Sequence, residues 1–177
     1  MIACRRCVVL LVLVLARSAP AFPQQSEICG STIPPNVQAG ALAGDMTGLL
    51  QASATFRQQC ARIAAAPSAR VNVTIVEPRA TVRAETTIRR YSAGGLIADV
   101  RIAFGQDYRE LIAHEFEHII EQLDGVNLRA EAANGRAWLI DGNVFETRRA
   151  SRVGIQVRRE CEISEAHAVV APHHDLR

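Results

Sequence analysis

The sequence predicts an α+β fold: an N-terminal helix, a small antiparallel sheet, and then further helices packed on one face of that sheet. Two changes of hydrophobic pattern indicate it. Apolar residues recur at helical intervals over residues 37–66 and again after Gly105, whereas over three stretches between residues 71 and 104 they alternate with polar residues, as in half-buried strands. Helices and strands that are segregated along the chain in this way are typical of α+β proteins.

The length and composition of the chain allow one domain. It has 177 residues, of which 49% are hydrophobic, enough to bury a core of its own. We predict that residues 37–171 form this domain. Residues 22–36 contain three prolines and are predicted to be an N-terminal arm, and residues 172–177 are predicted to be a disordered tail.

Residues 1–21 follow the plan of a secretory signal peptide. Arg5 and Arg6 precede an apolar run over residues 8–15, and small residues at Ala19 and Ala21 offer a cleavage site. The apolar run is short for a permanent membrane span, so an uncleaved anchor is the less favoured alternative. The sequence therefore predicts a protein exported to the periplasm or the extracellular space, with no membrane attachment after cleavage of the leader.

The charge of the predicted mature chain argues against a nucleic-acid partner. All basic residues are arginines, and three of them lie in the leader, which carries no acidic residue. Removal of the leader takes the formal net charge from +2 to about −1. A chain without excess positive charge lacks the electrostatic attraction to phosphates that drives nucleic-acid binding.

Three cysteines, Cys29, Cys60 and Cys161, remain after removal of the leader, in a compartment that permits disulfides. We favour a pair between Cys29 and Cys60, which would tie the arm to the first helix, although the spacing leaves the pairing open. The predicted mature chain has no C-x-x-C spacing. Neither a cysteine zinc site nor thioredoxin-like chemistry is therefore expected.

After the predicted strands, which centre on residues 71–75, 82–89 and 96–104 with a turn at 92–95, the pattern becomes helical. Asp107 and Glu110 have capping-box spacing, so a helix is predicted to begin there and to end near Gly125. A second helix is expected from about Asn127 and a third from about Val144.

The first of these helices carries the motif His114-Glu115-Phe116-Glu117-His118. Residues four apart project from the same face of a helix, so His114 and His118 can bind one Zn²⁺ ion together. Glu115 lies one position along, where it can act as a general base without binding the metal. A solvated polar face with two incidental histidines is the alternative interpretation.

A catalytic zinc site needs a third protein ligand, and the sequence offers three candidates. Glu146 is favoured if a later helix crosses the first. Its spacing from Asn143 also fits a capping box, which would make it structural. Asp124 has the spacing of an elongated H-E-x-x-H-x-x-G-x-x-H/D motif, but Glu121 occupies the glycine position. Glu131 is the weakest candidate.

The motif resembles that of the zincin superfamily of zinc metallopeptidases and, with Glu146, its gluzincin branch. The resemblance covers the middle of the chain, from the strands to Glu146. It implies that His114, His118 and Glu146 bind zinc and that Glu115 is the catalytic base in peptide-bond hydrolysis by a zinc-activated water. It further implies a peptide or protein substrate, which would lie along a sheet edge formed by residues 96–104.

Two departures from the gluzincin pattern leave alternatives open. The branch often has an acidic residue four positions after the ligand glutamate, where this chain has Ala150, and the chain is short for such a peptidase. A degenerate zincin that binds zinc for structure or partner recognition, or an exported protein without metal, would also fit.

Tyr91, Tyr108 and His167 are the candidate oxyanion donors. Trp138, the only tryptophan, is expected in the core.

Overall fold

The computed structural model describes residues 32–78, 82–92, 94–142 and 144–170. The predicted leader, Cys29 and the predicted tail lie outside these residues. The elements in chain order are β1 (Val37–Gln38), a 3₁₀ turn (Gly40–Leu42), α1 (Ala43–Ala52), α2 (Ala54–Ala64), β2 (Ala69–Val76), β3 (Ala84–Arg90), β4 (Leu96–Ala103), α3 (Tyr108–Leu123), α4 (Leu128–Ala133), β5 (Ala137–Asp141), β6 (Val144–Thr147) and α5 (Arg148–Val170).

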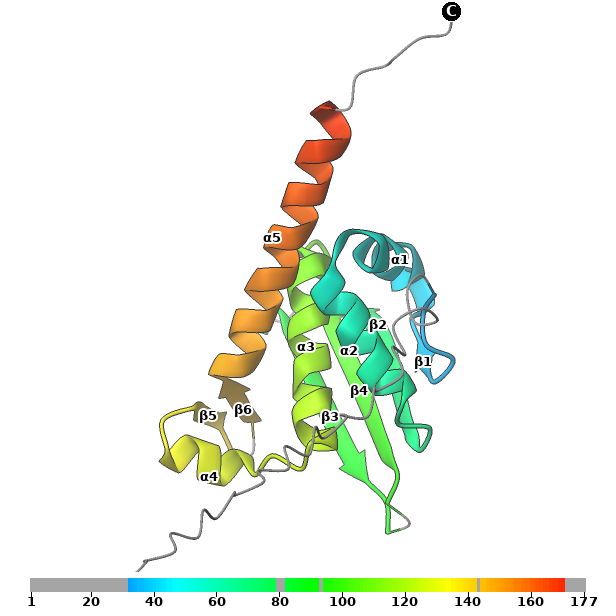
Figure 1. The fold of residues 1–177 in the computed structure, drawn as a ribbon. Coiled ribbons are helices and arrows are strands. Elements are labelled where there is room, and N and C mark those ends of the chain that lie inside the picture. The colour runs from blue at the N-terminus through cyan, green and yellow to red at the C-terminus, as the bar shows by residue number, and fades with distance from the viewer. Residues whose placement is uncertain (1–31, 79–81, 93, 143, 171–177) are drawn as a thin grey trace, which may run out of the picture.

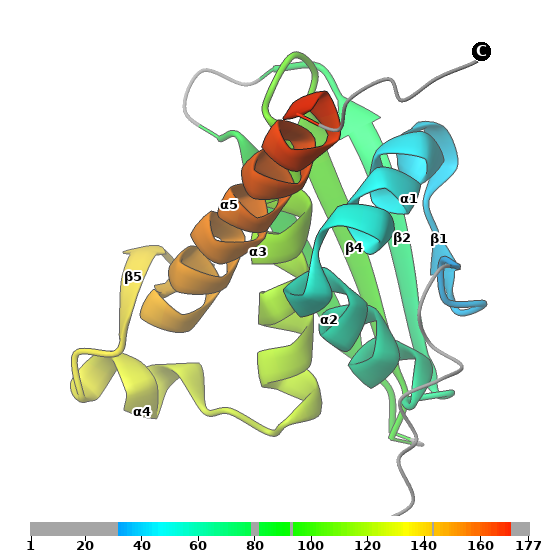
Figure 2. The same ribbon diagram turned by 45° about the horizontal axis from the view of Figure 1, so that its top comes forward.

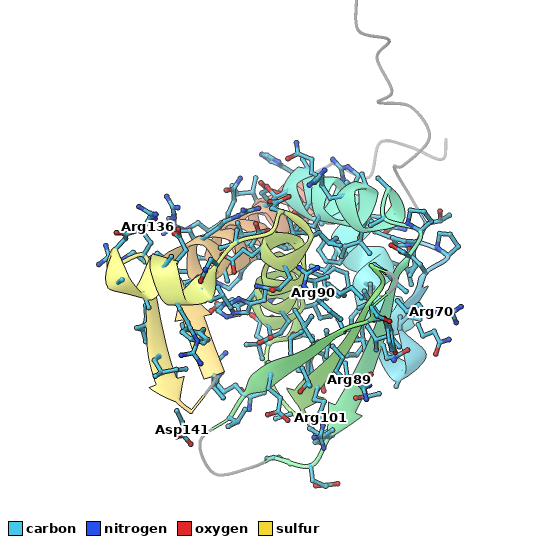
Figure 3. The ribbon with its side chains drawn as sticks, turned by 90° about the horizontal axis from the view of Figure 1, so that it is seen from below. Arg70, Arg89, Arg90, Arg101, Arg136 and Asp141 are labelled. Atoms are coloured by element: carbon cyan, nitrogen blue, oxygen red, sulfur yellow. The ribbon has the colours of Figure 1, made fainter. Side chains whose placement is uncertain are left out.

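The predicted α+β class is confirmed. Helices α1, α2 and α3 cover one face of a four-stranded sheet, and α5 lies across the outer side of α3 (Figures 1 and 2). The core lies between the sheet and these helices, around Phe56, Phe116 and Ile112. The other face of the sheet carries polar side chains such as Arg70, Arg89 and Arg101 (Figure 3).

The predicted antiparallel sheet is only partly correct. The strand order is β1-β2-β4-β3; β2 pairs with both β1 and β4 in parallel, and only β3 and β4 are antiparallel. Alternation with period two shows which side chains share a face of a strand, and it is the same for both directions of pairing. The alternation therefore could not show that β3, which follows β2 in the chain, pairs with the opposite edge of β4.

The same topology overturns a second expectation. Residues 96–104, expected at the edge of the sheet, include β4, which lies between β2 and β3. Among the described strands, β3 forms the edge on this side of the sheet. The turn expected at residues 92–95 does join β3 to β4: the amide of Tyr91 donates to the carbonyl of Gly95, and Gly94 has a φ of 82°.

The predicted N-terminal helix over residues 37–66 is wrong as a single element. The segment holds β1, the 3₁₀ turn and two helices, and the break between α1 and α2 falls at Ser53. Ser53 is extended, and its hydroxyl accepts a hydrogen bond from the amide of Phe56 at 3.0 Å. A serine in this role starts a new helix, which the spacing of apolar residues does not reveal.

The region after α3 also differs from the prediction. The helix expected from about Asn127 is the short α4, which Asn127 caps by accepting from the amide of Ala130. The antiparallel hairpin β5–β6 was not expected, and the helix expected from Val144 begins at Arg148. Trp138, expected in the core, lies on this hairpin and is 45% exposed.

Helix α5 secures the break at Ser53 through Glu160. This carboxylate accepts from the Ser53 hydroxyl at 2.5 Å and from the amide and the hydroxyl of Thr55 at 3.0 and 2.6 Å. Burial acts to raise the pKa of Glu160, but these bonds and one from Gln156 outweigh it and lower the pKa from 4.5 to about 2. The ionised carboxylate thus stabilises the first turn of α2.

We predict that Glu160→Gln lowers the free energy of unfolding at pH 7 by about 1–2 kcal/mol, the usual cost of weakening a helix cap. Because the folded pKa is depressed, the stabilisation is present above pH 4.5 and is lost as the pH falls towards 2. Urea unfolding at pH 7 and pH 3 measures both effects. Glu162→Gln, an exposed change on the same helix, is the control, and an equal loss in both variants would contradict the assignment.

Candidate metal centre

Helix α3 presents the H-E-x-x-H motif, and it begins and ends where the sequence predicts. The Asp107 carboxylate accepts from the amide of Arg109 at 3.1 Å, and Gly125 takes a φ of 74° just beyond the helix end. Glu110 does not close the expected capping box; its carboxylate accepts from Arg158 of α5 at 2.7 Å.

The structure brings His114, His118 and Glu146 together. The two imidazoles lie one turn apart on α3, with ring centroids separated by 4.9 Å. Glu146 reaches them from β6: its Oε2 lies 3.1 Å from Nε2 of His114, and its Oε1 lies 3.8 Å from Nε2 of His118. One ligand atom from each residue lies within 4.8 Å of the other two.

These three residues fit a tetrahedral zinc ion. Ligand atoms bound to zinc at about 2.0–2.2 Å in a tetrahedron lie about 3.3–3.6 Å from one another. The distances from Nε2 of His114 to Oε2 of Glu146, 3.1 Å, and from Nε2 of His118 to Oε1, 3.8 Å, lie close to that range, with a different carboxylate oxygen facing each histidine. Two neutral imidazoles and one carboxylate are also the donor set of catalytic zinc sites with one position open to water.

Glu146 is held as an ionised carboxylate. Burial acts to raise its pKa, but the hydrogen bond with His114 and the charges of both histidines outweigh burial and lower the pKa. The amide of Thr147 and, more weakly, the hydroxyl of Ser151 also donate to Oε1, at 2.9 and 3.4 Å. An ionised carboxylate is the form that binds a metal.

The other two candidates for the third ligand lie elsewhere. The Asp124 carboxylate is engaged by Arg62 at 2.5 Å and by Arg149 at 3.1 Å, at the end of α3. Glu131 pairs with Arg136 on the surface. The helix-cap interpretation of Glu146 is also wrong, because α5 begins after it and the amide of Ala150 donates to the hydroxyl of Thr147.

Glu121, which sequence reasoning treated only as the residue that replaces a glycine, orients His118. Its Oε2 lies 3.1 Å from Nδ1 of His118, on the side of the ring away from Glu146, and its Oε1 accepts from Thr147 at 2.7 Å. Burial acts to lower the pKa of His118, but the hydrogen bond with Glu121 and nearby carboxylates outweigh it and raise the pKa. A carboxylate behind a ligand histidine fixes the ring and its tautomer.

Glu115 lies beside the three residues but on the sheet side of α3. It is 4% exposed, and its Oε2 accepts from the hydroxyl of Thr86 on β3 at 2.6 Å. Burial raises its pKa, against the opposing effects of the two histidines and of Thr86. The sequence could not predict that Thr86 contacts Glu115, because this contact depends on β3 lying against α3.

Glu117, between the two histidines, has a structural role. It is buried against α2 and α5, where it accepts from Gln59 at 2.8 Å and from Arg149 at 2.6 Å. Helix α5 approaches α3 closely at Gly154: a methyl group there would lie 2.9 Å from the carbonyl oxygen of Glu110 and 3.1 Å from Cβ of His114. The small residue at 154 therefore lets α5 pack directly behind the motif.

The three candidate oxyanion donors are not part of this cluster. The Tyr108 hydroxyl accepts from the amide of Gly105 at 3.3 Å, Tyr91 is exposed at the end of β3, and His167 lies near the exposed end of α5. Within residues 32–170, apart from 79–81, 93 and 143, no hydrogen bond or ion pair joins any of them to His114, His118 or Glu146. The structure therefore assigns no oxyanion donor.

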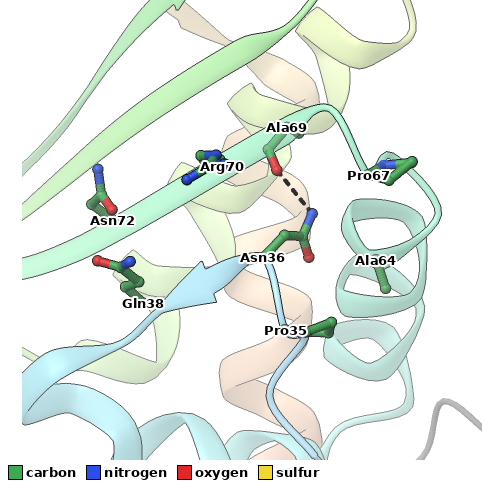
Figure 4. Close-up of a pocket in the computed structure, with 8 residues that line it drawn as sticks. All are labelled: Pro35, Asn36, Gln38, Ala64, Pro67, Ala69, Arg70 and Asn72. Atoms are coloured by element: carbon green, nitrogen blue, oxygen red, sulfur yellow. Dashed lines mark hydrogen bonds between the residues drawn. The ribbon is translucent and has the colours of Figure 1, made fainter.

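A hollow of about 380 Å³ lies away from the motif, between β1, β2 and α2 (Figure 4). Asn36 crosses it and donates to the carbonyl of Ala69 at 3.1 Å. Arg70, Asn72 and Gln38 line its side along the strands. None of its lining residues belongs to the candidate metal centre, so the hollow is not part of that centre.

Comparison of the chain with protein-family models, with curated proteins and with solved structures found no match in any of the three. In the part of the chain that the structure describes, no helix has the length and apolar character needed to cross a membrane. The candidate site is therefore assigned from its own residues.

We predict that Glu146→Gln abolishes stoichiometric zinc binding, whereas Asp124→Asn retains it. The first variant removes a charged ligand atom, and the second removes a carboxylate that only pairs with arginines. Zinc bound per chain after gel filtration, measured by elemental analysis, distinguishes them. Loss of zinc in the Asp124 variant alone would reverse the choice of third ligand.

We also predict that Glu121→Gln weakens zinc binding by about 10- to 100-fold, the usual effect of losing the group that orients a metal-bound histidine. Competition against a chromophoric chelator measures the affinity, and circular dichroism shows whether the fold is kept. Glu131→Gln is the matched control, since its carboxylate lies outside the cluster. Equal affinities in both variants would show that Glu121 does not support His118.

Proposed function

We propose that this chain is an exported zinc-dependent metallopeptidase of the zincin type, gluzincin-like, which hydrolyses peptide bonds with Glu115 as general base. One observation carries the proposal: His114, His118 and Glu146 converge on one point, while a separate acid, the buried Glu115, lies next to them and is bonded to a different partner. Three ligands and a separate base are what hydrolysis at a zinc site requires.

In this proposal His114, His118 and Glu146 hold the zinc ion. Bound zinc lowers the pKa of water and polarises a carbonyl group. The protein contributes rigidity, because Glu121 and Thr147 fix the second imidazole and the bonds from Thr147 and Ser151 fix the Glu146 carboxylate. Ligands held in place before the metal arrives bind it without a further loss of side-chain entropy.

Glu115 has the position and the bonding of a proton carrier. Its Oε2 is occupied by the Thr86 hydroxyl, which fixes the carboxylate, and the described residues provide no hydrogen-bond donor to Oε1. That oxygen can take a proton from the attacking water and pass it to the nitrogen that leaves. Thr86 is thus a positioning residue, since it acts only through Glu115.

The substrate in this proposal is an extended peptide along β3. The resemblance to zincins implied that residues 96–104 form the binding edge, but β3 is the described edge strand and carries Thr86 beside Glu115. An edge strand offers unpaired amides and carbonyls, to which a peptide can add as a further strand. The proposed path of the substrate therefore runs over β3 and past His114 and His118.

A degenerate zincin, which binds zinc for structure or for partner recognition, is the second candidate. It is favoured by one observation: no Tyr, His or Arg side chain of the described residues, apart from the two proposed ligands, is bonded within the cluster where it could stabilise an oxyanion. The two candidates share the zinc site and differ in the role of Glu115.

We predict that Glu115→Gln keeps stoichiometric zinc and lowers the rate of peptide hydrolysis by about 10²- to 10⁴-fold, the usual contribution of a general base. Glutamine has the shape of glutamate and can still accept from Thr86, so the fold is expected to persist. Hydrolysis of a quenched fluorescent peptide library by both proteins, each with its zinc content measured, makes the test. If both proteins keep zinc and neither cleaves any peptide, the second candidate is the right one.

A further inference from the structure

The β5–β6 hairpin carries four of the nine large apolar side chains that are exposed among the described residues. Trp138, Leu139, Ile140 and Val144 are all large apolar residues on its two strands, and each is between 45% and 62% exposed. Tryptophan and isoleucine are usually buried, and large apolar side chains left exposed on one short element of a small protein commonly mark a binding surface. Packing within the described fold does not account for their exposure.

The register of the hairpin connects Trp138 to the candidate metal centre. Trp138 is the cross-strand partner of Glu146. Partners in an antiparallel pair project to the same face, with Cβ atoms about 4.5–5.5 Å apart. Because the Glu146 carboxylate meets His114 and His118, the Trp138 indole lies on the face of the hairpin that adjoins the metal centre. Leu139 projects to the opposite face.

The centre itself lies between the hairpin and the sheet edge. Glu146 approaches α3 from β6, and Thr86 approaches it from β3, so a ligand held at the histidines has the hairpin on one side and the edge strand on the other. In Figure 1 the hairpin lies to the left of α3, and β3 passes behind this helix. A side chain next to a bond held at this centre would therefore lie on the Trp138 side of the hairpin.

We propose that Trp138 is a specificity residue, which selects peptides with a large apolar or aromatic side chain beside the scissile bond. This inference rests on the proposed peptidase function, of which it names the substrate class. The indole supplies a broad apolar face for such a side chain, at little entropic cost because it has few rotatable bonds. Among the described residues its N–H group has no hydrogen-bond acceptor, so it can face solvent or the peptide backbone.

The outer end of the hairpin argues against a lipid surface as the occupant. Asp141 and Gly142 follow the apolar residues at the turn, and Figure 3 shows Asp141 at the outermost end of the hairpin. A hairpin that entered a bilayer tip first would bury this carboxylate, which is costly. A peptide held against the face of Trp138 leaves Asp141 in water.

The single tryptophan permits a direct test of binding. The probes are two labelled octapeptides of alanine and glycine, one with a central phenylalanine and one with a central aspartate. They are added to the full-length Glu115→Gln protein with zinc, so that binding is measured without cleavage. We expect the phenylalanine peptide to shift Trp138 emission to shorter wavelength and to bind at least about 10-fold more tightly than the aspartate peptide.

The variants Trp138→Ala and Leu139→Ala, made in the same background, are compared by the anisotropy of the labelled peptides. Trp138→Ala should weaken binding of the phenylalanine peptide by about 10- to 100-fold and leave the aspartate peptide unchanged, because only apolar contact is lost. Leu139→Ala, an exposed apolar residue on the opposite face of the same strand, should change neither by more than about twofold. Equal losses in the two variants, or none in Trp138→Ala, overturn the inference.

The same variants, made with Glu115 intact, separate this inference from the peptidase proposal. If the preference for phenylalanine depends on Trp138 but no peptide is cleaved, the specificity inference stands and hydrolysis does not. If Trp138→Ala cleaves peptides and prefers phenylalanine as strongly as the unchanged protein does, the peptidase proposal stands and the specificity inference fails. A shift of Trp138 emission with vesicles of phosphatidylcholine and phosphatidylglycerol, and with neither peptide, would make the hairpin a lipid-binding element and overturn the inference.

Discussion

The burial of acidic side chains on α3 is the constraint on which the rest of the structure depends. Glu115, Glu117 and Glu121 are all buried on one helix of a protein whose core is otherwise apolar. A buried carboxylate without partners is strongly unfavourable, so each must be met by a donor from a neighbouring element. Those donors come from β3 for the first, from α2 and α5 for the second, and from β6 for the third.

This arrangement ties the position of the candidate site to the whole fold. Thr147 shows the connection: its hydroxyl donates to Glu121 and also accepts from the amide of Ala150 in the first turn of α5. The start of this helix and the orientation of His118 therefore depend on one side chain. Gly154 then brings α5 against α3 behind His114. Each of these contacts therefore supports a residue of the candidate metal centre without being part of it.

The sequence predicted the helix with the motif, because helical spacing is a local property, and residue chemistry favoured Glu146 over Asp124 as the partner of His114 and His118. It could not predict that Glu146 reaches the histidines from a strand. The hairpin has few residues per strand, and its apolar residues face outwards, so its pattern differs little from that of a helix start. The hydrogen-bond partners of the buried acids, such as Thr86 and Gln59, could not be predicted either, because they come from elements distant in sequence.

The relative direction of the strands is the other feature that the sequence could not predict. The alternation around Val71 and Val100 correctly indicates half-buried strands, but it is the same in parallel and antiparallel pairs. For the site, this error matters, because the topology puts β3 rather than β4 at the edge next to Glu115. The proposed path of a substrate therefore depends on information that only the structure supplies.

The central claim is that His114, His118 and Glu146 form one zinc site, and crystals soaked with zinc test it most directly. Diffraction data collected above and below the zinc absorption edge locate the metal by anomalous scattering. The claim predicts one strong peak per chain, within about 2.0–2.2 Å of both imidazoles and of the Glu146 carboxylate. A peak at other residues, or no peak at this cluster when zinc is in excess, would contradict it.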